Sequence, residues 1–108
     1  MGPLKGIKII EFSGIGPGPF CGMLLADLGA DVIRISRPEQ RGSHNKFDIH
    51  NRSKRSIVAD LKKPETILEI HKMISQVDDV FEGFRTGVIE RLDLGTRTCF
   101  PLNKALVY

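Results

Sequence analysis

The sequence predicts an α/β fold, built on an open parallel sheet with helices on both faces. Three observations predict it. Ile7–Phe12 is short, apolar and rich in branched side chains, which is typical of a buried strand. A loop of glycines and prolines over 13–19 leads into a helix pattern at Phe20–Leu28, which Gly29 ends. Ala30–Ser36 is a second strand pattern, and strand, loop, helix and strand within about thirty residues form a βαβ unit.

The rest of the chain continues this alternation. The expected elements are a long polar loop over 39–55, a strand over 56–61, a helix from Pro64 to about Gln76, a strand over 77–82, a short helix over 88–92, a helical stretch over 96–103 that Pro101 shortens, and a partial strand over 105–108. Pro64 suits the first helical position, because its missing N–H is not needed there. Strands that alternate with helices favour a Rossmann-like arrangement with right-handed crossovers.

Length and composition narrow the class of protein. The 108 residues suit one small domain, and an apolar share of 41% allows a core. Cys21 and Cys99 do not make a disulfide framework, and Cys21 lies on the apolar helix pattern, so we expect a buried thiol and an intracellular, reducing compartment. No apolar run reaches membrane-spanning length, the N-terminus has no signal-peptide pattern, and the net charge of +3 comes without the aromatic pattern of a nucleic-acid stacking platform. We therefore expect neither a membrane nor a nucleic acid as partner.

The C-terminal residues Ala105–Tyr108 have the pattern of a strand that begins and then stops. A parallel strand at that point has nothing to cover it. We therefore expect this chain to be the N-terminal part of a longer protein.

Ligands of open parallel sheets bind beyond the carboxyl ends of the strands. In this chain that rule selects the segments Ser13–Pro19, Ser36–Pro38, Ala59–Lys62 and Gly83–Arg85. The first segment fails the G-x-G-x-x-G motif, because the last glycine position falls on Pro19 or Cys21 in the two registers. An NAD site also needs an acidic residue where Ser36-Arg37 stands, so it is disfavoured. Arg37 instead suggests a phosphorylated ribose, as in NADP or coenzyme A, because guanidinium binds phosphate in a forked geometry.

Further cations follow the other strand ends. Lys62 lies at a strand-to-helix turn, Arg85 follows Gly83-Phe84, and Arg91 comes a short distance later. A glycine beside an aromatic residue and an arginine allows close backbone approach, adenine stacking and phosphate pairing. We expect Arg37, Lys62, Arg85 and Arg91 to share a cleft that takes an anionic, adenylated ligand.

Reactive side chains form no catalytic or metal-binding pattern. His44, His50 and His71 have no partner at metal-ligand spacing, and no Walker, HExxH, CxxC or GxSxG motif occurs. Glu11, in the first strand pattern, is expected to pair structurally with a nearby lysine, and Ser13 has no base near it in sequence. The residues therefore predict no metal site and no catalytic group in this chain.

A series of short motifs runs through nearly the whole chain. These motifs are Gly14-Ile-Gly-Pro-Gly-Pro-Phe20, Leu25-Ala-Asp-Leu-Gly-Ala-Asp-Val32, Arg34-Ile-Ser-Arg-Pro38, Arg52-Ser-Lys-Arg-Ser56, Ala59-Asp-Leu-Lys62, Glu82-Gly-Phe-Arg85 and Gly87-Val-Ile-Glu-Arg91. In this order and spacing they resemble the opening of the α-methylacyl-CoA racemases, which belong to the family III CoA-transferases. The expected fold is therefore the N-terminal part of a larger family III fold, and residues 1–108 are its CoA-binding α/β segment.

The resemblance implies CoA rather than NADP, bound as part of an acyl-CoA substrate with no prosthetic group. It implies that Arg37 packs against the adenine and phosphates of CoA, and it places the Gly16 region near the thioester end. The other positions that it assigns to the CoA site are Ala59, Asp60, Leu61, Lys62, Gly83, Phe84, Arg85 and Arg91. It also implies an interlocked homodimer. In the racemases a His and an Asp remove and return the α-proton through an enolate, and both are expected beyond Tyr108.

Two segments favour a racemase over a transferase. Arg34-Ile-Ser-Arg37 and Gly16-Pro-Gly-Pro19 look more like the racemases than like the Lys-Ile-Glu and Gln-Ala-Gly-Pro segments of the transferases. Arg97–Pro101 departs from the family's pattern. A CoA-transferase, a non-catalytic CoA-binding short form and an NADP-binding half-domain stand as alternatives. The family's usual location implies a peroxisome or mitochondrion in a eukaryote and the cytoplasm in a bacterium.

Overall fold

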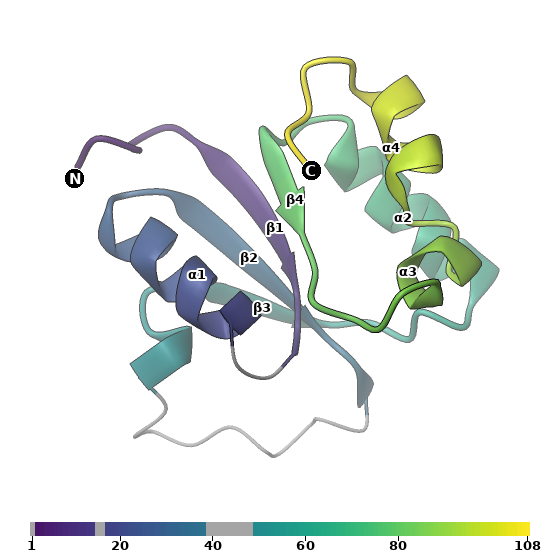
Figure 1. The fold of residues 1–108 in the computed structure, drawn as a ribbon, viewed down its shortest axis with the longest axis horizontal. Helices are drawn as coiled ribbons and strands as arrows, with labels where there is room; N and C mark the ends of the chain where they lie inside the picture. The colour runs from purple at the N-terminus through teal and green to yellow at the C-terminus, as the bar shows by residue number, and fades with distance from the viewer. Residues whose placement is uncertain (1, 15–16, 39–48) are drawn as a thin grey trace.

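A four-stranded parallel sheet forms the centre of the molecule (Figure 1). The computed structural model describes residues 2–14, 17–38 and 49–108. The strands are β1 (Lys8–Phe12), β2 (Asp31–Ser36), β3 (Arg55–Val58) and β4 (Asp79–Phe81), in the spatial order β3-β2-β1-β4. All three pairings are parallel, with Ile10 opposite both Ile33 of β2 and Val80 of β4. The chain therefore runs outward from β1 to β3 and then returns to the other side of β1, which confirms the predicted open α/β sheet.

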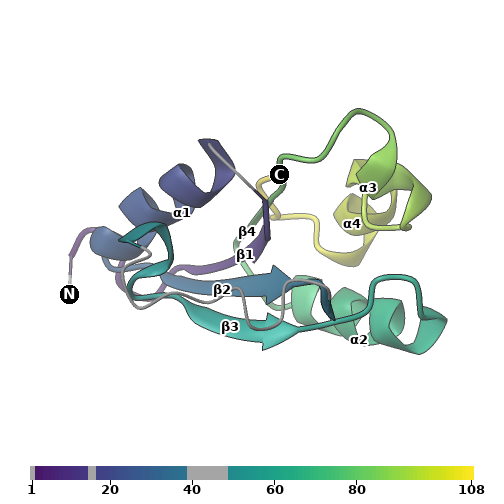
Figure 2. The same ribbon diagram turned by 90° about the horizontal axis from the view of Figure 1, so that it is seen from below.

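Helices cover both faces of the sheet, as predicted. They are α1 (Pro17–Asp27), the short 3-10 helix η2 (Ile49–Asn51), α2 (Pro64–Ile74), α3 (Val88–Arg91) and α4 (Thr96–Leu102). In Figure 2, α1 lies on one side of the sheet and α2 on the other. Alternate residues of β1 divide accordingly, because successive strand side chains point to opposite faces. Ile9 packs in a small cluster with Ala26 of α1, while Ile10 and Phe12 belong to a larger core with Ile70 of α2.

Helix α1 differs from the prediction in two respects. It begins at Pro17, three residues before the expected start, because a proline lacks the N–H that the first turn does not use. Cys21 is exposed, so its predicted burial is wrong. The helix is apolar on all sides, and its pattern could not indicate that the face with Gly22, Met23 and Ala26 would meet the sheet. The predicted end at Gly29 is confirmed, with a φ of 105° that suits glycine.

The other boundaries follow the predicted order with shorter strands. Strand β3 ends at Val58 rather than residue 61, because the chain turns at Asp60, whose carboxylate accepts the N–H of Lys62. Pro64 occupies the first turn of α2, as predicted. Val107 forms a parallel bridge with Asp79, so the predicted partial strand is confirmed on the outer side of β4. Of the predicted polar loop over 39–55, residues 39–48 lie outside the described residues, as does His44.

A buried ion pair joins β1, α1 and the residues before β3. Glu11 is fully buried, and its Oε1 lies 2.7 Å from the Nζ of Lys54, whose side chain is 1% exposed. The same ammonium donates to the carbonyl of Pro19, 3.1 Å away in α1. Burial raises the pKa of the Glu11 carboxyl, and Lys54 offsets part of that rise. The expected structural pairing of Glu11 with a lysine is confirmed.

Replacing Lys54→Met should destabilise the fold, because it leaves the Glu11 carboxylate buried without its cation. We expect a loss of about 3–5 kcal/mol in the free energy of unfolding at neutral pH, measured by urea denaturation. The folded-state pKa of Glu11 lies above its unfolded value, so stability falls as pH rises between the two. Without Lys54 the carboxyl loses the cation that lowers its pKa, so its folded-state pKa should rise further and the loss should be larger at pH 8 than at pH 5.

A matched control is Lys72→Met, because Lys72 and Glu69 form an ion pair whose side chains are 74% and 71% exposed. This change should alter stability by less than about 0.5 kcal/mol. Equal losses in the two variants, or a Lys54→Met loss that does not depend on pH, would contradict the account of the ion pair.

Gly22 of α1 allows the ion pair to approach the helix. A Cβ at this position would lie 2.9 Å from Lys54 Nζ and closer still to Glu11 Oε1. Gly22→Ala should therefore lower the melting temperature, although alanine favours helices by about 1 kcal/mol over glycine. Gly18→Ala, in the first turn of the same helix, meets no atom within 4 Å and should be neutral or stabilising. Thermal unfolding of both variants checks this, and a stabilised Gly22→Ala protein would show that the approach is not tight.

Candidate functional site

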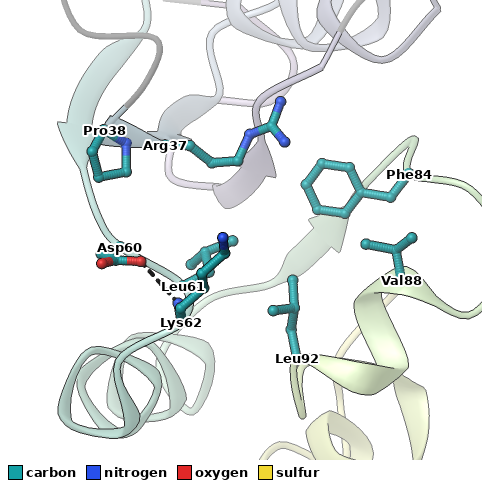
Figure 3. A pocket seen from close by; sticks show the side chains of 8 residues that line it. All are labelled: Arg37, Pro38, Asp60, Leu61, Lys62, Phe84, Val88 and Leu92. Atoms are coloured by element: carbon teal, nitrogen blue, oxygen red, sulfur yellow. Dashed lines mark hydrogen bonds between the residues drawn. The ribbon is translucent and has the colours of Figure 1, made fainter.

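A cleft lies at the carboxyl edge of the sheet, with a volume of about 380 Å³. One wall comes from residues that follow β2 and β3, and the other from residues that follow β4, as Figure 3 shows. The lining residues are Arg37, Pro38, Asp60, Leu61, Lys62, Phe84, Val88 and Leu92. The cleft therefore spans the end of β1. At this point the chain stops adding strands on one side of β1 and adds the next strand on the other side, and ligands of such sheets bind there.

The turn after β3 forms one wall. Asp60 Oδ1 accepts the backbone N–H of Lys62 at 3.0 Å, and the carbonyl of Asp60 accepts the N–H of Lys63 at 3.2 Å. An aspartate that binds the backbone two residues later stabilises a tight turn. The turn buries Leu61 and leaves the side chain of Lys62 extending toward the middle of the cleft (Figure 3).

An arginine from the same wall as this turn and an aromatic ring from the other wall approach each other. Arg37 Cζ is 6.0 Å from the centroid of the Phe84 ring, within the range of a cation–π contact. The Phe84 ring also lies 6.4 Å from the ring of Phe12, and its backbone N–H donates to Glu82 Oε1 at 2.8 Å. These contacts hold an aromatic face and a guanidinium group at the carboxyl ends of β4 and β2, the strands on either side of β1, and this arrangement suits a planar anionic ligand.

The remaining residues predicted for the site lie around the cleft in different ways. Ala59 is half-buried and packs against the larger core, next to the turn. Gly83 and Arg85 flank Phe84 in exposed positions, but neither lines the cleft. Arg91 lines a second depression, of about 560 Å³, which shares Leu61, Lys62 and Leu92 with the first. The structure thus brings Arg37 and Lys62 together, connects them to Arg91 through the shared residues, and leaves Arg85 outside both depressions.

Several lining residues were missed by reading the sequence. Val88 begins α3 and Leu92 directly follows it; both line the cleft, and their spacing of one helical turn could have been recognised beside Arg91. His71 of α2 lines the second depression, and only the tertiary contact between α2 and the residues after α3 reveals it. The predicted neighbourhood of Gly16 lies outside the described residues.

The side chains that line the cleft are charged or apolar. The cleft offers two cations, one carboxylate and an apolar floor, and its described lining includes no His, Cys, Ser or Thr. Cys99 is buried in the core, where desolvation raises the pKa of its thiol to about 11. Within residues 2–14, 17–38 and 49–108, no three metal-binding side chains lie close enough to hold an ion. Among the helices of these same residues, none combines the length and apolar character needed to cross a bilayer.

The strand order and the cleft define a Rossmann-type α/β protein. A short chain dehydrogenase/reductase family protein shares the fold at a TM-score of 0.60 and 23% identity, over 94% of this chain. The more specific match is to the family model of CoA-transferase family III, which covers residues 4–108. This chain belongs to CoA-transferase family III.

The individual relatives fall into two enzyme classes. The α-methylacyl-CoA racemases of mouse and human are 40% and 42% identical, over 97% of this chain and 26% and 27% of those proteins. The succinate–glutarate CoA-transferase of Agrobacterium fabrum is 34% identical over 98% of this chain and 31% of its own length. A CAIB/BAIF family protein from Brucella suis has a TM-score of 0.87 at 31% identity, over 99% of this chain and 32% of that structure. The chain thus spans between a quarter and a third of these relatives' lengths.

Proposed function

We propose that this chain is the CoA-binding segment of an enzyme that acts on acyl-CoA thioesters. The observation that carries the proposal is the cleft itself, in which Arg37 and Lys62 on one wall face Phe84 on the other. Family membership supports CoA as the ligand, because the relatives of both classes bear names of enzymes that act on CoA compounds. No prosthetic group is part of this proposal.

The cleft suits the adenosine phosphate end of CoA. The adenine ring stacks against Phe84 and the guanidinium of Arg37, and the 3′-phosphate pairs with the same guanidinium and with the Lys62 ammonium. The Leu61 side chain and the Asp60 turn form the floor beneath the ribose. The pyrophosphate extends toward the second depression and Arg91. Backbone groups at Ala59 and Gly83, and the exposed Arg85, provide the outer contacts.

For the whole enzyme we propose an α-methylacyl-CoA racemase. It would epimerise the α-carbon of 2-methyl-branched acyl-CoA thioesters by removing and returning a proton, with the residues that move the proton outside this segment. The 40–42% identity to two racemases supports this choice.

A family III CoA-transferase, which moves CoA between carboxylic acids, is the first alternative, and relatives of that class at 33–34% identity support it. A non-catalytic CoA-binding short form is the second alternative. An interlocked homodimer, and a peroxisomal or mitochondrial location in a eukaryote, belong to the same proposal.

CoA binding should depend on Arg37. We expect Arg37→Ala to weaken CoA binding to the 108-residue chain by about tenfold to a hundredfold, because charge-assisted hydrogen bonds contribute about 1.5–3 kcal/mol each. Isothermal titration calorimetry with CoA, dephospho-CoA, NADP and NAD measures this, and CoA should bind most tightly. Arg55→Ala is the matched control, because Arg55 pairs with Asp31 at the opposite end of the strands. NADP binding more tightly than CoA would favour the NADP-binding half-domain, and equal losses in the two variants would contradict the site.

Isotope exchange distinguishes the activities of the whole enzyme. In D2O, a racemase should place deuterium at the α-carbon of 2-methylacyl-CoA in both epimers, because the proton is removed and returned. Mass spectrometry and chiral separation of the hydrolysed product measure both events. Transfer of CoA to a free carboxylic acid, without exchange at the α-carbon, would instead identify a CoA-transferase. Neither reaction, in a protein that still binds CoA, would identify the non-catalytic form.

A further inference from the structure

The corner between α3 and α4 is held by side chains of α4 and of the C-terminal residue Tyr108. Asp93 has a left-handed backbone, with a φ of 61° that non-glycine residues rarely adopt. Thr98 donates to its carboxylate at 2.7 Å. At the next residue, the carbonyl of Leu94 accepts the Tyr108 hydroxyl at 2.8 Å and the Cys99 thiol at 3.3 Å. Side-chain hydrogen bonds therefore hold this corner in an unusual conformation, in addition to the backbone bonds that join the Asp93 and Leu94 amides to α3.

His71 supplies a further bond, from the opposite wall of the second depression. Its Nε2 lies 2.8 Å from the carbonyl oxygen of Asp93. A carbonyl oxygen only accepts, so Nε2 must carry the hydrogen. The ring lies on α2, which is anchored in the larger core through Ile67, Ile70 and Ile74. The bond thus connects the corner to a rigid helix.

Arg91 depends on this corner for its position. It is the last residue of α3, which has four residues, and helices this short do not stand without tertiary support. Ile89 and Leu94 are buried and set how deep α3 sits in the core. The Arg91 side chain itself is exposed, so its position follows from how the end of α3 is oriented. His71 bonds to the carbonyl of Asp93, which lies two residues after Arg91, and so holds the end of α3.

We infer that His71 is a positioning residue for Arg91 in the phosphate-binding part of the cleft. The inference rests on the proposed CoA-binding function. His71 lines the second depression together with Lys62 and Arg91, and its bond to Asp93 sets the distance between α2 and α3 across that depression. The side chain acts through the backbone that carries Arg91, rather than by pairing with the phosphate.

A positioning role differs from a direct cationic role in its pH dependence. The charged groups around the ring are Lys62, Arg91 and Asp93 across the second depression, and Glu65, Glu69 and Lys72 on its own helix. Nε2 donates to the carbonyl whether the imidazole is neutral or protonated, so the bond to Asp93 persists in both states. A direct phosphate contact would instead strengthen as the ring gains a proton. The ratio of CoA affinities between wild type and a His71→Gln variant should therefore stay constant from pH 5.5 to pH 7.5.

Calorimetric titration of the 108-residue chain with CoA tests the inference. His71→Ala should bind CoA roughly fivefold more weakly, which is the order of one net hydrogen bond, while His71→Gln should restore binding because its amide also donates. His71→Ala should add no further loss to an Arg91→Met protein, since the two changes remove the same contact. His50→Ala, on η2 beside Phe20, is the matched control and should bind as wild type.

Three results would overturn the inference: a full additional loss in the double variant, a His71→Gln protein as weak as His71→Ala, or an affinity ratio that changes with pH. Failure of wild type to bind CoA would instead overturn the proposed function.

Hydrogen exchange would then test, without CoA, whether His71 holds the corner between α3 and α4 in place. His71→Ala should speed exchange at the amides of Asp93 and Leu94, which bond to Glu90 and Ile89, and leave Ile10 of β1 unchanged. Unchanged exchange at the corner would show that His71 does not hold it.

Discussion

The central position of β1 determines where the cleft can form. The chain leaves β1 in one direction through β2 and β3, and returns on the other side as β4, so the segments that follow these strands diverge at the carboxyl edge. Arg37 and Lys62 come from one side of that divergence, and Phe84 from the other. Residues far apart in sequence therefore face each other because parallel strands bring all their carboxyl ends to one edge. The site is a consequence of strand order as much as of residue type.

The two faces of the sheet support this edge differently. On the α2 face a continuous apolar core, which includes Phe12 and Ile70, holds the helices that form the walls. On the α1 face the apolar cluster is small, and the Glu11–Lys54 pair takes part of its place. Because Lys54 directly precedes β3, the pair also fixes the strand that leads to Asp60 and Lys62. A buried pair of this kind is costly to break, so it defines one arrangement of α1 against β1.

Much of this arrangement could be predicted from the sequence. The features that could not be predicted have physical causes. Strand and helix order followed from hydrophobic periodicity, and the meeting of Arg37 with Lys62 followed from the rule that strand ends share an edge. The exposure of Cys21 could not be predicted, because α1 is apolar on every side and the sheet selects its buried face. The absence of Arg85 from the cleft, and the presence of His71 beside Arg91 in the second depression, depend on where the residues after β4 lie in the fold, which local patterns do not encode.

The most direct test of the account is to map CoA on the protein by nuclear magnetic resonance. Backbone amide signals of the 108-residue chain would be followed during titration with CoA. The account predicts that the largest shifts fall on Arg37, Lys62 and Phe84, with smaller ones at Arg91, and that the amino ends of the strands around Asp31 and Arg55 stay unchanged. Shifts centred on the amino edge of the sheet, or none that include Arg37 and Phe84, would contradict it.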